Sequence, residues 1–536
     1  MKAVFYFIPT WNQSDNDWST TYPEWYFTTN KMEFDDTVNQ LMMFNRAEEK
    51  NKTIILEYAP MLRDFLQRQD LYDINYYSIF DDLQDTKVEN VRPIDPFEFD
   101  WPKNAVFIYN PFYILVRVDN QPYAQIISGN LGQLQRINFF KEKKLSKVYI
   151  FDDRGFLSSI ITHNDNGFEK QEFFNLAGEW RFRLEHDGKV TVNPLFKQDF
   201  KQTNYDSMRD LISEKYSEFI EHNLTEDDVV VLAGEKRHNQ RILDLPRQSK
   251  VIMSIFSDRL DIEHDFPDLE QLKKVDVIVA DTPRNTELVK DKLAELNIQL
   301  PVLQIPPFDS RLRLGQSQRI RALRVFVLVD KTPIEELKIV TNEVVQFMQK
   351  NKYVELILGG YAANSSSMEK LDYLKERILD KLNITEADVQ AAEMAENELQ
   401  DEESQEILRN VKLFKRVDFY KIDSENSLVS KLNFVRLIID MGKDMDLYLQ
   451  IAGISAGIPQ INSVPSPYVD HQKNGLIVPD SLGLKHALEH YLVGLKNWNE
   501  ALVYTTKKIV QYSSDNLVGL WNDALQLSKK GESLSE

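Results

Sequence analysis

The sequence predicts an α/β protein made of two Rossmann-like halves, with an antiparallel β domain inserted into the first half. The chain has 536 residues, of which 42% are hydrophobic and 28% charged, a globular composition that at about 100–200 residues per domain suits two to four domains. Short buried-strand runs alternate with helical segments in two separate stretches, as in parallel sheets. Between residues 104 and 194, short aromatic and β-branched runs replace that alternation.

The strands of the first half are predicted where short apolar runs are bounded by acids, glycine or proline. These runs are Lys2–Ile8, Thr53–Tyr58, Asp227–Gly234, Val275–Ala280 and Val302–Pro306. A polar stretch over residues 30–51 can form the helix that connects the first two strands. Such crossovers are required between neighbouring parallel strands.

The insertion is predicted from a series of short runs with turn residues between them. The runs are VFIYN, YILVRV, AQIISG, KVYIFDD, LSSIITHN, EWRFRLEH and KVTVNP. The turn residues include Asp119-Asn120, Asn164–Gly167 and Asp187-Gly188. Strands joined by such short turns pair as antiparallel hairpins, so this region is expected to form a meander.

A proline-containing, basic segment over residues 301–324 is interpreted as a linker to the second half. The second set of predicted strands is Leu323–Val329, Val354–Leu358, Val411–Phe414 and Gln460–Asn462. Residues 386–406 hold nine acids and no Lys or Arg, and we expect a solvated helix that Thr385 and Asp388 cap. A docking site for a basic partner is the alternative. Residues 484–525 show the spacing of amphipathic helices.

Charge and composition exclude several classes of protein. The formal net charge is −20 and no basic patch of any size is evident, since Lys141–Lys144 is short and includes an acid. Nucleic acid is therefore not an expected partner and anionic lipid is disfavoured. The chain has no cysteine, which excludes disulfides and thiol catalysis. No signal peptide and no membrane-spanning run is visible, so we expect a cytoplasmic protein. No cofactor is expected.

The run Gly453–Gly457 fits the G-x-S-x-G pattern of a hydrolase, with Ser455 as the nucleophile. Such a serine needs a strand before it and a helix after it. Here Pro459 would break the helix, and residues 444–456 are better explained as a helix that Gly457 ends. A serine hydrolase is therefore the least favoured hypothesis.

Two residue pairs have a spacing that could serve a metal. Asp444 and Asp446 could bind a divalent cation, but acids just before a helix more often cap it. His486 and His490 are four residues apart on one helix face, yet no third ligand is evident. No metal site is expected.

Two further features have a structural and a functional explanation. Gly359-Gly360 follows an apolar run and predicts either a phosphate-binding loop or a tight turn. Trp11, Trp18 and Trp25 lie in an aromatic, polar N-terminal segment. Flat rings with polar neighbours bind sugars or polypeptide, but the same rings can pack the segment onto the core. The sequence does not decide between the two roles.

The stretch Leu447–Pro479 contains S-A-G-I-P, an apolar run and N-G-L-I-V-P. This order resembles the C-terminal half of a retaining glycosyltransferase with the GT-B fold, in which two Rossmann-like domains face each other across a cleft. Val325–Gly360 resembles the start of the donor-binding domain. The inserted β region resembles the extended β domain of glycosyltransferases that modify serine-rich adhesins.

The segments Phe5–Trp11 and Leu428–Asn462, together with the layout of the whole chain, resemble one family more specifically. This is the first of the accessory secretory proteins of the accessory Sec system, which in Gram-positive cocci exports serine-rich repeat glycoprotein adhesins. The resemblance implies a glycosyltransferase shape without transferase activity. It also implies a complex with the other accessory secretory proteins, the accessory motor ATPase and the adhesin, with peripheral membrane association through these partners.

Departures from the catalytic pattern support that implication. Catalytic relatives have a Glu five residues before the G-x-P glycine, where this chain has Ala452, although the acid eight residues earlier survives as Asp444. The run Ser463–Pro467 replaces glycines and a Glu, and only Lys331 remains of two cations after the first donor-domain strand. No glycine occurs in Pro9–Asp17. The residues of the expected vestigial donor cleft are Lys331, Gly359, Gly360, Asp444, Ala452 and Gly457.

We therefore expect four parts. They are an N-terminal Rossmann-like domain (1–110 and 225–308), an inserted extended β domain (111–224), a C-terminal Rossmann-like domain (309–510) and a final helix that packs back on the first domain (511–536). The expected function is a non-catalytic GT-B-like component of adhesin export that binds the adhesin or its glycans. The alternative is an active glycosyltransferase that uses a nucleotide-sugar donor.

Overall fold

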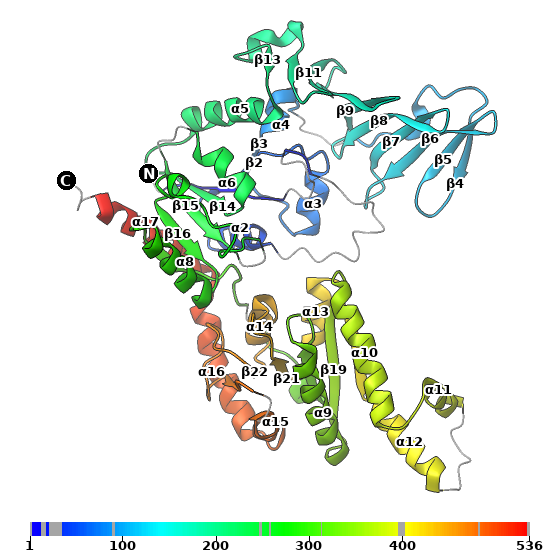
Figure 1. Cartoon of the computed structure of the whole chain (residues 1–536), viewed down its shortest axis with the longest axis vertical. Helices are drawn as coiled ribbons and strands as arrows, with labels where there is room; N and C mark the ends of the chain where they lie inside the picture. Colours follow the sequence, from blue (N-terminus) through cyan, green and yellow to red (C-terminus); the bar gives the residue numbers. More distant parts are fainter. Residues whose placement is uncertain are drawn as a thin grey trace. The chain divides into compact units, whose positions relative to one another are not determined.

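The computed structural model describes residues 3–11, 18–20, 35–87, 92–245, 249–256, 259–311, 313–394, 402–480 and 483–532. The chain divides into two compact units (Figure 1). Unit 1 comprises residues 1–28, 36–307 and 521–536, and unit 2 comprises residues 29–35 and 308–520.

A parallel sheet forms the centre of unit 1, with the strand order β17-β16-β15-β14-β1-β2-β3. Its strands are β1 (Phe5–Ile8), β2 (Asn51–Ile55), β3 (Tyr76–Ser78), β14 (Val229–Ala233), β15 (Lys250–Ile255), β16 (Val277–Ala280) and β17 (Val302–Gln304). Every residue of β1 and β14 is buried, which is expected for central parallel strands with helices on both faces.

Several helices of unit 1 begin at polar caps, whereas the helix that starts at Leu62 has no side-chain cap. The hydroxyls of Ser207 and Thr282 accept the backbone N–H groups of Asp210 and Asn285, at 3.2 and 3.1 Å, so each satisfies an orphan donor of its helix. The helices are α2 (Asp36–Arg46), α3 (Leu62–Arg68), α4 (Ile79–Gln84), α5 (Met208–Asn223), α6 (Lys236–Leu243), α7 (Leu269–Leu272) and α8 (Pro283–Glu295), with 3₁₀ turns η1 (Pro96–Glu98) and η2 (Pro194–Asp199).

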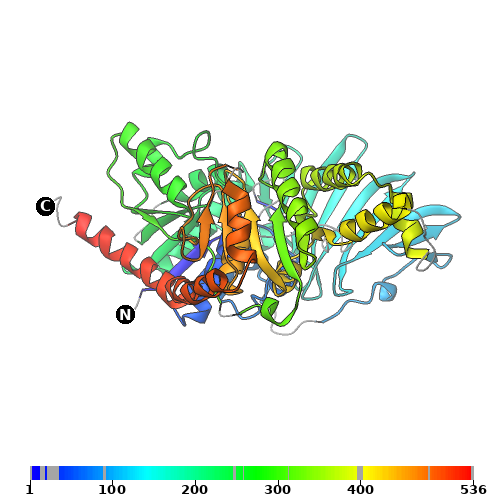
Figure 2. The same ribbon diagram turned by 90° about the horizontal axis from the view of Figure 1, so that it is seen from below.

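The region between the two parts of this sheet forms one long antiparallel sheet, in the order β13-β12-β11-β10-β9-β8-β7-β6-β5-β4 (Figure 2, cyan to blue-green). Its strands are β4 (Val106–Tyr109), β5 (Ile114–Val118), β6 (Gln121–Ser128), β7 (Leu134–Lys141), β8 (Lys144–Asp152), β9 (Phe156–Asn164), β10 (Gly167–Phe174), β11 (Trp180–Glu185), β12 (Val190–Val192) and β13 (Asn204–Tyr205). The sequence does not predict β7 and β10. The β7–β8 turn uses Glu142 and Lys143 in the left-handed conformation (φ 52° and 65°), and this residue pair carries no turn signal.

The long sheet contributes to two hydrophobic cores. Residues of β5 to β8, with Trp101 and Phe107, form a small separate cluster. In contrast, Phe173 and Phe182 of β10 and β11 belong to the main core of unit 1 and pack near Phe80 of α4. The inserted strands therefore share a core with the parallel sheet. The domain boundaries at residues 110 and 224 stay a prediction.

Unit 2 contains a second parallel sheet, in the order β20-β19-β18-β21-β22-β23. Its strands are β18 (Leu323–Leu328), β19 (Val354–Tyr361), β20 (Val417–Ile422), β21 (Val435–Asp440), β22 (Gln460–Asn462) and β23 (Gly475–Ile477). Its helices are α9 (Ile334–Lys350), α10 (Ser365–Lys381), α11 (Glu386–Met394), α12 (Glu402–Phe414), α13 (Glu425–Leu432), α14 (Leu447–Ser455), α15 (Leu484–Leu492) and α16 (Lys496–Gln511), and η3 (Ser317–Arg319) precedes β18.

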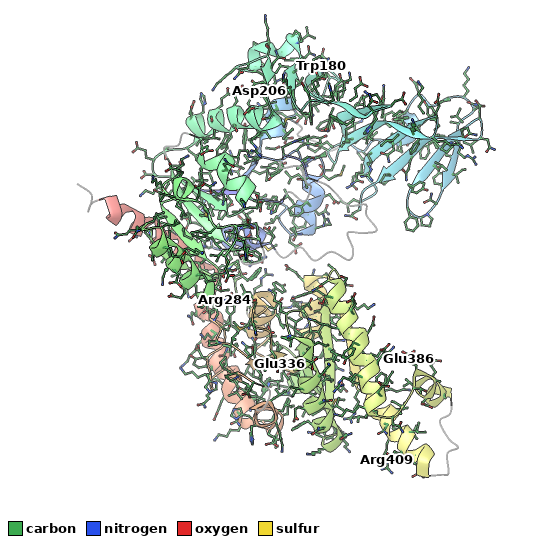
Figure 3. All side chains as sticks on the ribbon, viewed as in Figure 1. Trp180, Asp206, Arg284, Glu336, Glu386 and Arg409 are labelled. Atoms are coloured by element: carbon green, nitrogen blue, oxygen red, sulfur yellow. The ribbon has the colours of Figure 1, made fainter. Side chains whose placement is uncertain are left out.

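The strand predicted at Val411–Phe414 is wrong, because these residues form the last turn of α12. The strand in this part of the chain is β20, which begins at Val417. A run of four apolar residues does not distinguish a strand from a helix. The acidic segment is helical in its described part, and Figure 3 marks Glu386 on α11 and Arg409 on α12. The predicted capping pair is confirmed: Asp388 accepts the backbone N–H of Thr385 at 2.7 Å, and Thr385 Oγ1 accepts that of Asp388 at 3.2 Å.

The last helix, α17 (Ser514–Glu532), begins in unit 2 and ends in unit 1. Trp521 is 1% exposed, and its ring centroid lies 6.4 Å from that of Phe7 and 6.1 Å from that of Phe44. This indole thus belongs to the core of the N-terminal sheet. Over the described residues, every helix is too short or too polar to cross a bilayer.

Candidate functional site

The strand order locates the candidate site in unit 2. The order reverses between β18 and β21. The strands β19 and β20 follow outward from β18 on one side, whereas β22 and β23 follow outward from β21 on the other. In open parallel sheets, ligands bind outside the carboxyl ends of the strands at such a reversal point. We call the loops after β18 and β21, Val329–Thr332 and Met441–Asp446, together with the β19–α10 junction, the switch-point edge.

Asp330 follows β18 and points its carboxylate at the β19–α10 junction. It accepts the backbone N–H of Tyr361 at 3.1 Å, the side-chain amide of Asn364 at 3.2 Å and the hydroxyl of Ser367 at 2.5 Å. Burial raises the pKa of Asp330, and these three donors oppose the increase. Asn364 also caps α10. A carboxylate of the protein itself therefore occupies the start of this helix, where anions commonly bind.

Lys370 of α10 is held by the same loop. Its ammonium donates to the carbonyl oxygens of Val329, Asp330 and Thr332 at 3.0, 2.7 and 2.9 Å. Burial lowers the pKa of Lys370 and the neighbouring Asp330 opposes that decrease. The amino group is thus used to hold the loop after β18 in place.

Asp440 is the last residue of β21 and is fully buried. Its two carboxylate oxygens accept the backbone N–H groups of Gly442 and Asp446, both at 3.0 Å. Burial raises the pKa of Asp440 to about 6, the nearby Asp446 adds to the increase and Lys331 reduces it. Lys331 therefore lies close enough to Asp440 to act on its charge.

Asp446 is the N-cap of α14 and accepts the backbone N–H of Leu449 at 2.7 Å. It also acts on Tyr361, since burial and then the Asp446 carboxylate raise the pKa of that phenol. The prediction that the acids before this helix cap it is confirmed for Asp446. Asp444 is exposed in the loop two residues earlier, and the helix begins at Leu447.

The chemistry of the switch-point edge follows from these contacts. Three carboxylates, those of Asp330, Asp440 and Asp446, accept four backbone N–H groups and two side-chain donors from the surrounding loops. A diphosphate needs such donors together with cations. The edge thus combines these three carboxylates with the cations of Lys331 and Lys370.

Gly359 and Gly360 do not form a loop, because both lie inside β19. A Cβ on Gly359 would come within 2.3 Å of the Phe326 ring, and one on Gly360 within 3.0 Å of Val329. The two interpretations offered by the sequence, a phosphate loop and a tight turn, are both wrong at this position. The glycines allow close packing between neighbouring elements.

Ala452 lies inside α14, and Gly457 follows the end of this helix. Ala452 packs with the apolar cluster that includes Leu449 and Ile458. Gly457 has φ +72°, and the backbone bonds of Gly457 to Ile454 and of Ile458 to Gly453 form a Schellman motif. The predicted role of Gly457 as the end of this helix is confirmed.

Ser455 is the last residue of α14 and does not sit on a strand-to-helix turn. Its hydroxyl donates to the carbonyl oxygen of Ile451 at 2.8 Å and accepts the backbone N–H of Arg311 at 3.0 Å. A nucleophile elbow requires a strand before the serine. The geometry therefore contradicts a hydrolase at Ser455.

The indoles of Trp11 and Trp18 are each 9% exposed. The ring of Trp11 lies 4.8 Å from that of Phe65, and the ring of Trp18 lies 6.2 Å from Phe80 and 6.1 Å from Phe173. Of the two roles left open by the sequence, the structure supports packing onto the core for both residues. Trp25 lies outside the described residues.

Within the described ranges, no group of three or more His, Asp or Glu side chains is arranged to bind a metal. His490 interacts with Asn497 at 3.2 Å, and His486 lies 3.7 Å from Glu489 on the same helix. These contacts are those of ordinary surface histidines.

The sequence did not single out Asp440, Tyr361 or Ser367. A signal for Asp440 was available, since the apolar run V-R-L-I-I-D ends in an acid as a buried parallel strand often does. Tyr361 and Ser367 carry no such signal. They join the site because the end of β19 and the first turn of α10 lie beside the loop after β18.

Comparison with known proteins supports both the fold and the family resemblance. The family model for the first accessory secretory protein of the accessory Sec system matches residues 4–528. The corresponding accessory Sec system protein of Streptococcus gordonii is 35% identical over 534 residues, which cover 98% of this chain and 99% of the relative.

Two solved structures extend the comparison. A chain in the crystal structure of accessory secretory protein 1, 2 and 3 in Streptococcus pneumoniae is 31% identical, with a TM-score of 0.77 and coverage of 98% of this chain and 99% of that chain. The pneumococcal O-GlcNAc transferase GtfA, solved in complex with UDP and GlcNAc, is 12% identical, with a TM-score of 0.65 and coverage of 98% and 99%. The second likeness shows the fold alone, and it confirms the predicted GT-B-like architecture.

Proposed function

The chain belongs to the family of the first accessory secretory protein of the accessory Sec system, and from that premise we propose that it is a non-catalytic GT-B-like component of this export machinery. It acts in a complex with the other accessory secretory proteins and binds the serine-rich repeat glycoprotein adhesin or its glycans. The complex passes the adhesin to the accessory motor ATPase at the inner face of the membrane.

The observation that supports the absence of catalysis is the set of carboxylates at the switch-point edge. Asp330, Asp440 and Asp446 accept backbone N–H groups at this edge, and we propose that these donors are therefore not available to a diphosphate. The side chain of Ala452 has no acceptor atom, whereas catalytic relatives have a Glu at this position. Loss of one preorganised charge partner costs about 10²–10³ in rate, so a site changed at several positions is expected to be inactive.

The complex is proposed from the relatives. The Streptococcus pneumoniae structure contains accessory secretory proteins 1, 2 and 3, and the Streptococcus agalactiae relative was solved as a Gap123 complex at 33% identity and a TM-score of 0.77. Mixing this chain with purified accessory secretory proteins 2 and 3 of its own system should give one species in sedimentation velocity. Independent sedimentation of the three proteins at 10 μM would contradict the proposal.

The experiment for the donor site is calorimetric titration with uridine-diphosphate N-acetylglucosamine and uridine-diphosphate glucose, each with and without Mg²⁺. We expect no heat of binding. A dissociation constant below about 1 mM, equivalent to roughly −4 kcal/mol, would instead favour the active glycosyltransferase. Transfer of radiolabelled sugar to a serine-rich acceptor peptide would then decide between donor binding alone and catalysis.

Binding of the adhesin is tested separately. Glycosylated and unglycosylated forms of a serine-rich repeat segment are titrated against the chain alone and against the assembled complex. We expect the glycosylated form to bind at least tenfold more tightly. Equal affinity would remove the glycan from the proposal and leave the polypeptide as the ligand.

A further inference from the structure

The strand β4 is the free edge of the long antiparallel sheet in the described part of unit 1 (Figure 1). It pairs with β5 on one side, in the register Val106↔Arg117 to Tyr109↔Ile114. The backbone N–H of Asn110 donates to the carbonyl oxygen of Tyr113 at 3.2 Å and closes this hairpin. Hydrogen-bonded pairs alternate along an antiparallel ladder, so the backbone groups of Phe107 and Tyr109 point away from β5.

Large apolar side chains surround this edge on both faces. On one face, Tyr109 is 67% exposed and its ring lies 6.2 Å from that of Phe97, which is 43% exposed. On the other face, Val106 is 58% and Ile108 is 40% exposed. Proteins usually protect edge strands with charged residues or proline in the strand, and β4 contains neither. The edge therefore has the properties of a docking surface.

The segment that packs on the Tyr109 face of β4 is negatively charged, whereas Arg117 of β5 lies opposite Val106 on the other face. Asp95, Glu98 and Asp100 are exposed in the segment that carries Phe97. With the exposed Lys103 the net charge over residues 95–103 is −3 + 1 = −2. Phe97 contacts Phe107 as well as Tyr109, with ring centroids 5.1 Å apart, so the segment that carries these acids packs on the face of β4 that holds Tyr109.

We propose that β4 accepts an extended strand from another protein, one in which apolar residues alternate with basic residues. The partner's backbone pairs with Phe107 and Tyr109. Because its side chains alternate between the two faces, its apolar side chains cover Val106 and Ile108 on one face. Its basic side chains lie on the other face, where the segment that carries Phe97, Glu98 and Asp100 packs. Strand addition of this kind obtains affinity from the backbone and specificity from alternate side chains. The surface belongs to unit 1, and the proposal does not depend on whether the switch-point edge of unit 2 is active.

A second copy of this chain fits the surface less well. Pairing of β4 with β4 around a two-fold axis would continue the sheet and place both copies of residues 95–100 on the same face. Their acids would then approach each other, and like charges placed side by side are unfavourable. This argument selects a basic partner over self-association.

The test uses the full chain and a fluorescein-labelled nonapeptide in which Lys and Thr alternate with Val, measured by fluorescence anisotropy. A second peptide has Glu in place of every Lys. We expect the basic peptide to bind with a dissociation constant below about 1 mM and the acidic one at least tenfold more weakly. Failure of the basic peptide to bind, or equal binding of both, overturns the proposal.

Two variants locate the binding to the edge. Tyr109→Pro removes one outward N–H without touching the bonds to β5, and proline is tolerated at such edge positions. Glu98→Lys combined with Asp100→Lys reverses the local charge. Each should weaken the basic peptide at least tenfold, whereas the control Tyr72→Ala, which removes an equally exposed tyrosine (64%) elsewhere in unit 1, should not. Circular dichroism confirms that each variant is folded.

Sedimentation equilibrium of the chain alone completes the test. We expect a monomer at 50 μM. A dimer that Tyr109→Pro dissociates would show that a second copy is the occupant and would overturn the choice of a basic partner. If none of the variants changes the affinity for the basic peptide, the peptide binds elsewhere on the protein, and the assignment to β4 is overturned.

Discussion

Gly457 shows how one residue fixes the end of α14. Its φ of +72° lies in the left-handed region, which costs a side chain-bearing residue about 1–3 kcal/mol. A Cβ at this position would also meet a methyl group of Leu502 at 2.4 Å and one of Leu314 at 3.0 Å. The glycine of the G-x-S-x-G pattern is therefore explained by helix termination and packing, without any role for Ser455.

Gly457→Ala should destabilise the protein by about 1–3 kcal/mol, because the strain and the contact with Leu502 add to each other. The measurement is the free energy of unfolding in urea. Gly519→Ala is the matched control, since it lies inside α17 with no atom within 4 Å of the added Cβ and should be neutral or stabilising by up to about 1 kcal/mol. Equal effects of both changes would refute this explanation.

Trp18 is predicted to act in the core. Its carbonyl oxygen accepts the backbone N–H of Tyr58 at 2.8 Å, and its ring packs with Phe80 and Phe173. Trp18→Ala should lower the free energy of unfolding by about 3–5 kcal/mol. If the variant instead kept its stability and lost affinity for the glycosylated adhesin, the ligand-contact role considered from the sequence would be correct.

Asp440 should make stability depend on pH. Burial raises its folded pKa to about 6, above the value of about 3.9 in an unfolded chain. The stabilisation of the folded state by protonated Asp440 is therefore fully present below about pH 4 and is lost as the pH rises through 6. Above pH 6, the ionised Asp440 carboxylate lowers the free energy of unfolding by up to about 3 kcal/mol relative to its value at low pH.

Asp440→Asn should flatten this dependence. The difference in the free energy of unfolding between pH 5 and pH 7.5 should be smaller in the variant than in the parent protein. Asp153, whose pKa is also raised to about 6 mainly by burial, is present in both proteins and cancels in the comparison. An unchanged pH dependence would mean that Asp440 does not titrate in this range.

At the scale of elements, a charged network anchors the β8–β9 turn to the helices of unit 1. Arg154 donates to Asp152 at 2.7 Å and to Asp81 of α4 at 2.6 Å. Arg63 of α3 donates to Asp152 at 2.9 Å and also pairs with Asp153. The side chains of Arg154 and Asp152 are 8% and 5% exposed, so these charges depend on their partners.

Arg154→Leu should destabilise the protein by about 3–5 kcal/mol, because it leaves the Asp152 and Asp81 carboxylates with fewer partners in a buried site. The control is Lys144→Ala, which breaks the Lys144–Asp165 pair. The side chains of that pair are 74% and 94% exposed, and its loss should change stability by less than about 0.5 kcal/mol. Chemical unfolding measures both, and a small effect of Arg154→Leu would show that the turn is held by packing alone.

The sequence predicts most elements whose pattern is local. The apolar runs of β1, β14 and β18 and the cap at Thr385 are recognisable because each carries its own signal. Strands β15 and β21 are not predicted, although β21 is buried throughout, because K-V-I-M-S-I and V-R-L-I-I-D include polar residues that only tertiary contacts satisfy. The Arg436 guanidinium in β21, for example, donates to the carbonyl oxygen of Ser317 at 2.9 Å.

The sequence predicts which loops form the candidate site, but not most of the side chains that meet there. Lys331 and Asp444 are placed near it by the resemblance, and both follow strands of the switch-point edge. The interpretation of the glycine pair fails, because its purpose is contact with Phe326 and Val329 and no local pattern shows such a contact. The carboxylate of Asp330 meets Tyr361 and Ser367 only after the sheet has formed, so sequence spacing could not reveal that cluster.

At the scale of the molecule, both parallel sheets reverse their strand order next to the first strand of each unit. Unit 1 reverses between β1 and β14 and unit 2 between β18 and β21. A nucleotide that binds a sheet of this topology occupies the edge at the reversal. Here the fold is retained, while the loops of unit 2 direct carboxylates into that edge. Under the proposed function, loss of donor binding is a property of several loops together.

If the chain is inactive as proposed, two causes of the inactivity can be separated. If the absent Glu at position 452 were the only defect, Ala452→Glu would restore binding of uridine-diphosphate N-acetylglucosamine. If the carboxylates of Asp330 and Asp440 also oppose the diphosphate, the single change will not restore it, because the repulsion remains. We expect the second result. A thermal shift assay with 5 mM nucleotide sugar reports binding, since a ligand at 100 times its dissociation constant stabilises by about 2.7 kcal/mol. A rise in melting temperature for Ala452→Glu alone would show that the edge is open and would return the active glycosyltransferase to consideration.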